Sequence, residues 1–399
     1  MTKYILILAA LFFACTNSEK KNSVNNPTYM ASPAKAGSSV PHLFTDGNGA
    51  TYLSWIEKEG SENHFKFSTL KDNLWSQPLT IAHGENWFVN WADYPMLAAT
   101  DQELIAHFLS KSGEGTFAYD IMLVSSHDKG KTWGNQRVLH DDGKEAEHGF
   151  VSLLPYGDDF FVAWLDGRNT ATEGMEHHEG HHGEMSVRAA IVDKSGAKIK
   201  EWELDKRVCD CCQTSAAMTG SGPIVIYRDR SDEEIRDMSI VRLVDGQWTK
   251  PETIYSDNWK IAGCPVNGPR VDAMGNNLAI AWFSSPEGNA KVRVIFSSDG
   301  GATFGEPVQV DEGKAIGRVD VVMLDEDNAM VSWMEGPVIK AVKVNRDGSK
   351  EPPITIASSS DARSSGFPQM TKSGSELIFA WTDDKEKIIK TARISWVNN

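Results

Sequence analysis

Residues 160–166 read FFVAWLD: a short apolar run leads into a small residue, an aromatic residue and, two positions later, an acid. Seven segments share the small-then-aromatic ending, at spacings of about fifty to sixty residues, which indicates a repeat architecture. The residues at the aromatic position are Trp55, His107 with Phe108 beside it, Trp164, Tyr227, Trp282, Trp333 and Trp381. In five units an acid follows two places later: Glu57, Asp166, Asp229, Glu335 and Asp383.

Each unit contains more than this one strand. A short strand precedes it, often led by proline, as in YPML (94–97), and further strands follow, as in HFKFSTL (64–70). Three or four antiparallel strands per unit are typical of propeller blades, which must stack in a ring to bury both faces. We therefore predict an all-β fold, a single β-propeller of four-stranded antiparallel blades over residues 37–396, with seven blades counted and six as the alternative. A pair of β-sandwiches is the competing interpretation. The last unit is one strand short, so we expect a segment around 28–36 to supply its outer strand.

Two other segments fit the pattern S-x-D-x-G-x-T-aromatic. Their residues are Ser126, Asp128, Gly130 and Trp133 in the first, and Ser297, Asp299, Gly301 and Phe304 in the second. In such a hairpin turn the Asp accepts backbone N–H groups, the Gly takes a positive φ and the aromatic ring packs beneath. These segments resemble the Asp boxes, or BNR repeats, of the sialidase (neuraminidase) superfamily. The boxes of that family lie at blade edges away from the channel, so the resemblance implies the fold more than the activity.

The resemblance also implies a site at one mouth of the central channel, near the starts of the innermost strands. The candidate catalytic residues there and at nearby strand ends are Asp93, Tyr94, Glu147, Arg168, Arg230, Arg270 and Arg318. A sialidase holds a sugar carboxylate with arginines and uses a carboxylic acid and a tyrosine nucleophile with a glutamate partner. The family's Arg-Ile-Pro motif is absent from this sequence. An exo-acting glycoside hydrolase on sialic acid or another acidic sugar is one interpretation. The other is a non-catalytic surface propeller that binds a glycan, a protein or a metal.

Cysteines gather at the same mouth. VCDCCQTS (208–215) has Cys209, Cys211 and Cys212 before one innermost strand, and Cys264 precedes the innermost strand of the next unit. Because adjacent blades lie side by side, we expect all four thiols to meet. A disulfide between Cys264 and one of the others is the favoured prediction for an exported protein. Zn or Cu bound by the thiolates, with His148 as an extra ligand, is the alternative, and no cofactor is required.

One loop is a second candidate for metal binding. It reads ATEGMEHHEGHHGEMS (171–186), and its histidines are His177, His178, His181 and His182. A solvated polar loop without a specific ion is the interpretation that we favour.

The beginning of the chain predicts where the protein acts. Lys3 and an apolar run from Tyr4 to Ala14 precede Cys15. The run is too short to span a bilayer and resembles a bacterial lipoprotein signal peptide over residues 1–15, with Cys15 acylated and 16–36 as a polar tether. We expect export to the bacterial cell envelope and membrane contact through the lipid anchor only. The net charge of -15 argues against a nucleic-acid partner. The resemblance implies a carbohydrate or glycoconjugate as partner, and we expect a monomer.

Overall fold

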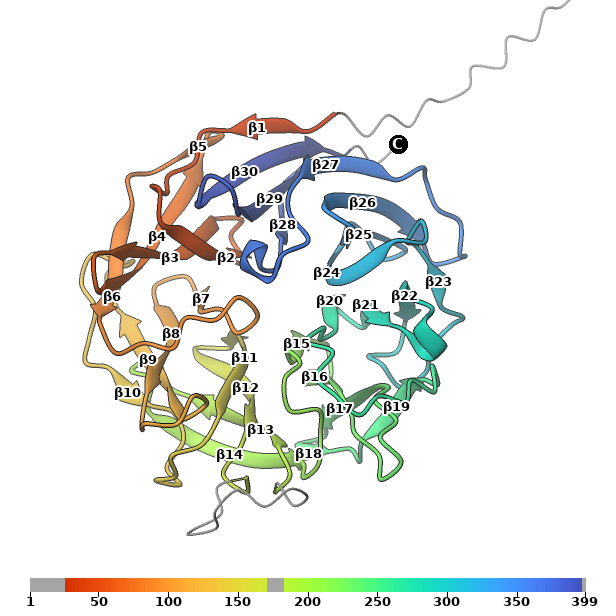
Figure 1. Ribbon diagram of the computed structural model, residues 1–399, viewed down its shortest axis with the longest axis horizontal. Helices are drawn as coiled ribbons and strands as arrows, with labels where there is room; N and C mark the ends of the chain where they lie inside the picture. Colours follow the sequence, from red (N-terminus) through yellow and green to blue (C-terminus); the bar gives the residue numbers. More distant parts are fainter. Residues whose placement is uncertain (1–25, 171–182, 397–399) are drawn as a thin grey trace, which may run out of the picture.

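The strands form a closed ring of seven antiparallel sheets round a central axis (Figure 1). The computed structural model describes residues 26–170 and 183–396. The all-β propeller is confirmed, with seven blades and not six. Helical structure in these residues is limited to two short 3-10 turns, η1 (Pro286–Gly288) and η2 (Arg363–Ser365). No helix in the described part of the chain is long and apolar enough to cross a membrane.

Every blade has the same order of strands from the axis outward. The innermost strands are β2 (Ser38–Thr45), β7 (Met96–Ala99), β11 (His148–Tyr156), β15 (Ser215–Met218), β20 (Arg270–Met274), β24 (Ala315–Met323) and β28 (Gln369–Ser373). The second strands are β3 (Thr51–Glu59), β8 (Leu104–Lys111), β12 (Asp159–Asp166), β16 (Pro223–Arg228), β21 (Asn277–Ser284), β25 (Asn328–Glu335) and β29 (Glu376–Asp383). The third strands are β4 (Glu62–Lys71), β9 (Tyr119–Ser126), β13 (Ser186–Val192), β17 (Met238–Val244), β22 (Lys291–Ser297), β26 (Val338–Asn345) and β30 (Ile388–Ser395). The outer strands are β5 (Leu74–Trp75) with β6 (Leu79–Gly84), β10 (Arg137–Val138), β14 (Lys198–Asp205), β18 (Gln247–Trp248) with β19 (Glu252–Tyr255), β23 (Val308–Gln309), β27 (Ile354–Ser358) and β1 (Thr28–Met30).

The repeated aromatic residues all lie on second strands, where they are buried between blades. A buried indole N–H needs an acceptor, and the acid two residues later supplies one. The pairs are Trp55 with Glu57 at 3.2 Å, Trp164 with Asp166 at 2.8 Å and Trp333 with Glu335 at 2.7 Å, measured from Nε1 to the carboxylate oxygen. Trp381 is equally buried, but its Nε1 has no hydrogen-bond partner among the described residues. The repeated pattern is therefore a buried core residue, which in three blades has its own buried acceptor two residues later.

The first described strand closes the ring. β1 adds to β30 as an antiparallel outer strand, with Thr28 opposite Arg393 and Met30 opposite Thr391 (top of Figure 1). The Ile389 amide also donates a hydrogen bond of 2.9 Å to Ser38 Oγ of the first blade. The expectation that a segment near residues 28–36 supplies the missing strand is confirmed.

The two S-x-D-x-G-x-T turns have the same hydrogen bonds. Each joins a third strand to its outer strand, β9 to β10 and β22 to β23. Asp128 Oδ1 accepts from the Thr132 amide at 2.8 Å, and Asp299 Oδ1 accepts from the Thr303 amide at 2.9 Å. Gly130 has φ +81, and a Cβ there would lie 2.3 Å from Phe67 of the preceding blade, so the turn needs glycine to pack against its neighbour.

Candidate functional site

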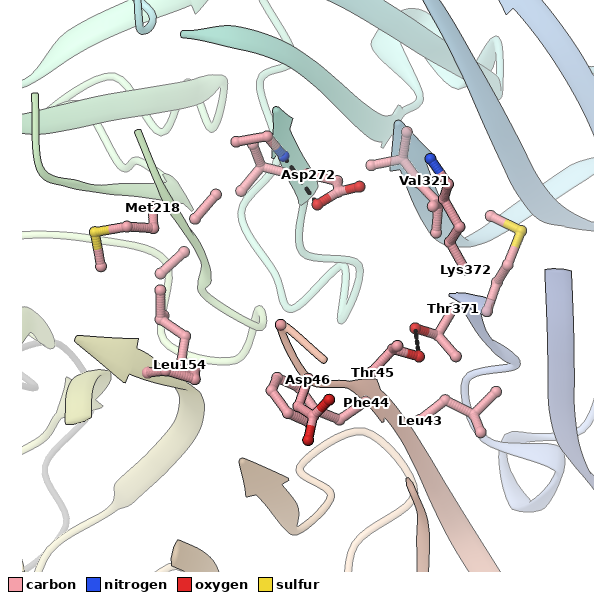
Figure 2. A pocket seen from close by; sticks show the side chains of 18 of the residues that line it. Leu43, Phe44, Thr45, Asp46, Leu154, Met218, Asp272, Val321, Thr371 and Lys372 are labelled. Atoms are coloured by element: carbon pink, nitrogen blue, oxygen red, sulfur yellow. Dashed lines mark hydrogen bonds between the residues drawn. The ribbon is translucent and has the colours of Figure 1, made fainter. Parts of the chain in front are cut away.

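The two ends of the channel differ in chemistry. We call the end where the innermost strands begin the upper mouth and the end where they finish the lower mouth. A cavity of about 750 Å³ lies toward the lower mouth, among the final residues of the innermost strands (Figure 2). Its charged side chains are engaged locally: Asp272 accepts from the Met323 amide at 2.7 Å, and Lys372 donates to the Leu324 carbonyl at 2.5 Å. The predicted site residues lie at the upper mouth.

Two of the predicted residues meet there around a tyrosine. The Tyr119 hydroxyl donates to Glu147 Oε1 at 2.8 Å and lies 3.3 Å from Asp93 Oδ2. Tyr119 begins β9, and its amide donates to the Ala146 carbonyl at 3.0 Å, which holds the tyrosine beside the residues that precede β11. Tyr119 and Asp93 are buried, whereas Glu147 is partly exposed. The three side chains form a tyrosine with two carboxylates.

A β-bulge completes this centre. Phe150 has a positive φ of 54 in β11, at the register shift between Gly149 and Ser152. The bulge releases the Phe150 amide from the strand ladder, and the amide donates to Asp93 Oδ1 at 2.8 Å. A positive φ at a bulky residue is costly, and it is retained here where it orients the buried carboxylate.

Both carboxyl groups have raised pKa values. Burial raises the pKa of Asp93 to about 8, against the hydrogen bond from Phe150 and with a contribution from the charge of Glu147. Burial also raises the pKa of Glu147 to about 7, opposed by the hydrogen bond from Tyr119 and assisted by the charge of Asp210. The centre can therefore hold a proton near neutral pH, as acid–base groups must.

Apolar side chains flank the centre on the same face. The Phe88 ring stacks on Tyr119 with 4.0 Å between centroids. Phe117 packs edge-on against Phe88, and 57% of its surface is exposed, while Val89 is 41% exposed. An exposed aromatic ring beside polar groups is a surface on which the apolar face of a sugar can lie.

Tyr94 lies in a different group from Glu147. Its ring lies near His42 and Phe367, and the Arg270 guanidinium is 5.3 Å from its centroid. Its hydroxyl has no hydrogen-bond partner among the described residues. The tyrosine that contacts the carboxylates is Tyr119, which the sequence analysis did not select.

The predicted arginines are mostly engaged by their own partners. Arg168 pairs with Asp166 at 2.7 Å, and Arg230 pairs with Glu234 at 2.8 Å and with Asp210 at 3.2 Å. Arg318 donates to Ser365 Oγ and to three backbone carbonyls, those of Asp361, Ala362 and Gly366. Arg270 is 3.9 Å from Asp320, and its Nη2 has no partner among the described residues. A carboxylate clamp of three free guanidinium groups is therefore not formed by these residues.

The cysteines converge as the repeat predicts. The Sγ atoms of Cys209, Cys211 and Cys212 lie within 4.8 Å of one another, and the Cys209–Cys212 contact is 3.2 Å. A hydrogen bond with the Cys211 thiol lowers the pKa of Cys264, so the fourth thiol reaches the group. Tetrahedral Zn with bonds of about 2.3 Å places its sulfur ligands nearly 4 Å apart, so the 3.2 Å contact of Cys209 with Cys212 would have to widen for such an ion to be bound. All four are free thiols in the structure, and the disulfide stays a prediction.

His148 does not lie with the cysteines. It stacks on His140 and contacts Asp142 and Asp166 instead. Of the histidine-rich loop 171–186, residues 171–182, with all four histidines, lie outside the described residues.

Comparison with known proteins gives relatives in structure only. No model of a protein family and no curated protein matches the chain. The polysaccharide lyase Uly1 superposes with a TM-score of 0.55 at 10% identity, over 96% of this chain and 94% of the lyase. The α-L-arabinofuranosidase Arb93A from Fusarium graminearum gives 0.50 at 12% identity, over 94% and 98%. A Hadza microbial sialidase gives 0.43 at 14% identity; the match covers 74% of this chain and 63% of the sialidase. The likeness is one of fold. The propeller of this chain is thus shared with carbohydrate-active proteins of very different sequence.

Proposed function

We propose that this protein is a carbohydrate-active propeller that cleaves a glycan at its upper mouth, with Tyr119 and Glu147 as the reacting pair. The observation that carries the proposal is the 2.8 Å hydrogen bond between the Tyr119 hydroxyl and Glu147, with Asp93 at 3.3 Å. A tyrosine paired with a carboxylate is the nucleophile arrangement of sialidase-type hydrolases. The lyase and arabinofuranosidase that share the fold add support by analogy, because fold alone assigns no chemistry.

The geometry assigns a role to each group. Glu147 accepts the phenolic proton while the Tyr119 oxygen bonds to the anomeric carbon; the bond to the leaving oxygen breaks at the same time, and that oxygen takes a proton from water. Asp93 holds the tyrosine from its other side and is itself fixed by the Phe150 amide. Substrate reaches the pair from the side of Glu147, which is the partly exposed member. The Phe88–Phe117 surface supports a sugar ring beside it.

An acidic sugar is the substrate class that we propose to test first. Arg230 pairs with Asp210, whose charge acts on Glu147, and also with Glu234, so a sugar carboxylate would replace one of these partners. Guanidinium groups bind sugar carboxylates in a bidentate fashion. We also propose that the protein is exported and anchored through Cys15, which would expose this mouth to glycans outside the cell.

Turnover of sialylated, uronate-containing and neutral glycans by the purified protein tests the proposal. New reducing ends without an unsaturated sugar indicate hydrolysis, and an unsaturated uronate indicates a lyase. Glu147→Gln and Tyr119→Phe should each lower kcat/KM by about 100-fold or more. Tyr94→Phe is the matched control, because it removes a buried hydroxyl with no partner in the described structure. Absence of any product, or equal turnover by wild type and Tyr119→Phe, would refute the enzyme and leave a glycan-binding propeller.

A second candidate function is metal binding by the thiols. The three Sγ atoms within 4.8 Å of one another, with Cys264 against Cys211, favour it. Zn or Cu would be bound by Cys209, Cys211, Cys212 and Cys264. Thiol counting on the unfolded, unreduced protein and metal analysis of the folded protein test this role. Two free thiols support the Cys264 disulfide, whereas four free thiols without a bound metal exclude both states.

A further inference from the structure

A buried pair of histidines lies behind the upper mouth, between the second and third blades. His148 is the first residue of β11, and His140 lies in the connection from β10 to β11. Their rings stack with 3.6 Å between centroids and 8° between planes. The His148 side chain is fully buried and that of His140 is 3% exposed. Three carboxylates, those of Asp120, Asp142 and Asp166, surround the pair.

The contacts of His148 determine where its proton lies. Nδ1 is 3.2 Å from the Ala146 carbonyl oxygen and 3.3 Å from that of Tyr119, so Nδ1 carries hydrogen and donates. In the neutral ring Nε2 then presents a lone pair to Asp142 Oδ2 at 3.1 Å. Two acceptors face each other at this distance only when a proton or a metal cation lies between them. A backbone carbonyl that fixes one ring nitrogen and directs the other is the usual environment of a metal-binding histidine.

The ring nitrogens of His140 also face carboxylate oxygens, but they form no hydrogen bond within the described structure. Its Nδ1 is 3.4 Å from Asp142 Oδ2 and its Nε2 is 3.4 Å from Asp120 Oδ1. Neither nitrogen has a hydrogen-bond partner among the described residues. A buried imidazole without partners is costly, and its two nitrogens point at carboxylates. Protonating both stacked rings would place two like charges face to face, so protons do not resolve both sets of contacts.

The charges of the group leave room for a divalent ion. Arg168 engages Asp166 through two hydrogen bonds of 2.7 Å and also lies 3.4 Å from Asp142, so one guanidinium is set against the three carboxylates of the group. Three carboxylates against one guanidinium leave two uncompensated negative charges, which match one dication. The donor atoms of Asp120, His140 and His148 lie within 4.8 Å of one another. Two imidazoles and two carboxylates suit a first-row transition ion such as Zn(II).

We propose that Asp120, His140, Asp142 and His148 form a binding site for a divalent transition-metal ion, distinct from the thiol group. The ion would connect β9 to β11 across the junction of two blades. Its ligands Asp120 and His148 follow Tyr119 and Glu147 directly in the chain. The site would therefore hold these two residues in position, but its existence does not depend on the proposed glycan cleavage.

The test is metal titration of the full-length protein after removal of bound metal with a chelator. Cobalt(II) is the probe, because thiolate ligands give strong charge-transfer absorption, whereas nitrogen and oxygen ligands give only weak visible bands. We expect one cobalt per chain with the nitrogen–oxygen spectrum, displaced by zinc. The weak visible bands of cobalt bound by nitrogen and oxygen, here called the nitrogen–oxygen component, should be absent from His140→Gln and from Asp120→Asn.

Three controls separate this site from other ligands. Asp141→Asn changes the neighbouring carboxylate, whose side chain is 73% exposed, and should keep the ion. Replacing His177, His178, His181 and His182 by Asn should also leave the component in place, and Cys211→Ser should alter only the thiolate absorption. Circular dichroism confirms that each variant is folded, and Asp120→Asn, at a partly exposed side chain, provides the test if His140→Gln does not fold. Lack of a nitrogen–oxygen component in the wild type, or its persistence in folded Asp120→Asn, would overturn the proposal.

Discussion

Replacing Trp333 and Trp381 by phenylalanine should have unequal effects on stability. The two indoles occupy equivalent positions on β25 and β29, and both are at most 1% exposed. Each substitution removes the same ring atoms from the core, so the cavity costs are similar. Among the contacts of the described residues, only Trp333 also loses a hydrogen bond, the 2.7 Å contact from Nε1 to Glu335. The difference between the variants therefore isolates that bond.

The size of the difference follows from what Glu335 retains. A hydrogen bond to a charged group contributes about 1.5–3 kcal/mol. Glu335 is buried, but it still accepts from the Glu312 amide at 3.1 Å and from the Lys314 amide. Because the carboxylate keeps two donors, we expect the lower end of the range, about 1.5 kcal/mol more loss for Trp333→Phe than for Trp381→Phe.

Equilibrium urea unfolding, followed by fluorescence and circular dichroism, measures the difference. The free energies are compared at one pH with m values held in common, because a change in m would indicate a change in the unfolded state. Glu335→Gln in the wild-type and Trp333→Phe backgrounds provides the coupling energy of the pair. Equal losses from the two tryptophan variants, or no coupling in the cycle, would refute the view that the acid in the repeat is there to satisfy the indole.

Three further predictions follow from other parts of the ring. Deleting residues 1–31 removes β1 and should lower the urea midpoint and increase proteolysis at β30; an unchanged midpoint would show that closure by β1 contributes nothing. Burial alone would raise the pKa of Asp299, but hydrogen bonds from Thr303 outweigh burial and lower it to about 2. Its stabilising contribution is therefore full above the unfolded pKa of about 4 and lost as the pH falls through 2, so Asp299→Asn should flatten the acid unfolding curve in that window. Cys15→Ser should release the protein from the membrane fraction of cells, and unchanged sedimentation would exclude the lipid anchor.

Much of the fold was predictable because a buried second strand of the same kind recurs in every blade. A buried tryptophan with an acid two residues on, as in Trp164 and Asp166, marks a second strand wherever it occurs. Counting these strands gave the number of blades, and the missing strand of the last unit predicted β1. The convergence of Cys264 with Cys211 also followed from the repeat, since residues one unit apart occupy neighbouring places in a ring.

The composition of the site was less predictable. Asp93 and Glu147 were selected because they precede innermost strands. Tyr119 was missed because it begins a third strand. In an antiparallel blade the first and third strands run the same way, so both begin at the upper mouth, and this rule would have selected Tyr119. Arg318 binds Ser365 and backbone carbonyls of the same loop, whose path no local pattern encodes. The sequence therefore identified the charged residues. Whether each of them is already paired within the protein, and so unable to bind a ligand, depends on tertiary contacts.

Ring closure has a consequence for synthesis and folding. β1 and Ser38 leave the ribosome early, yet they contact β30 and Ile389, and the Ser38–Ile389 hydrogen bond joins residues 351 positions apart. The last blade can be completed only after almost the whole chain has emerged. Until then the edge of β30 and the unpaired β1 segment can each form backbone hydrogen bonds with strands of other chains. A truncated chain therefore keeps an open strand edge, which a protease or chaperone can recognise as the mark of an unfinished molecule.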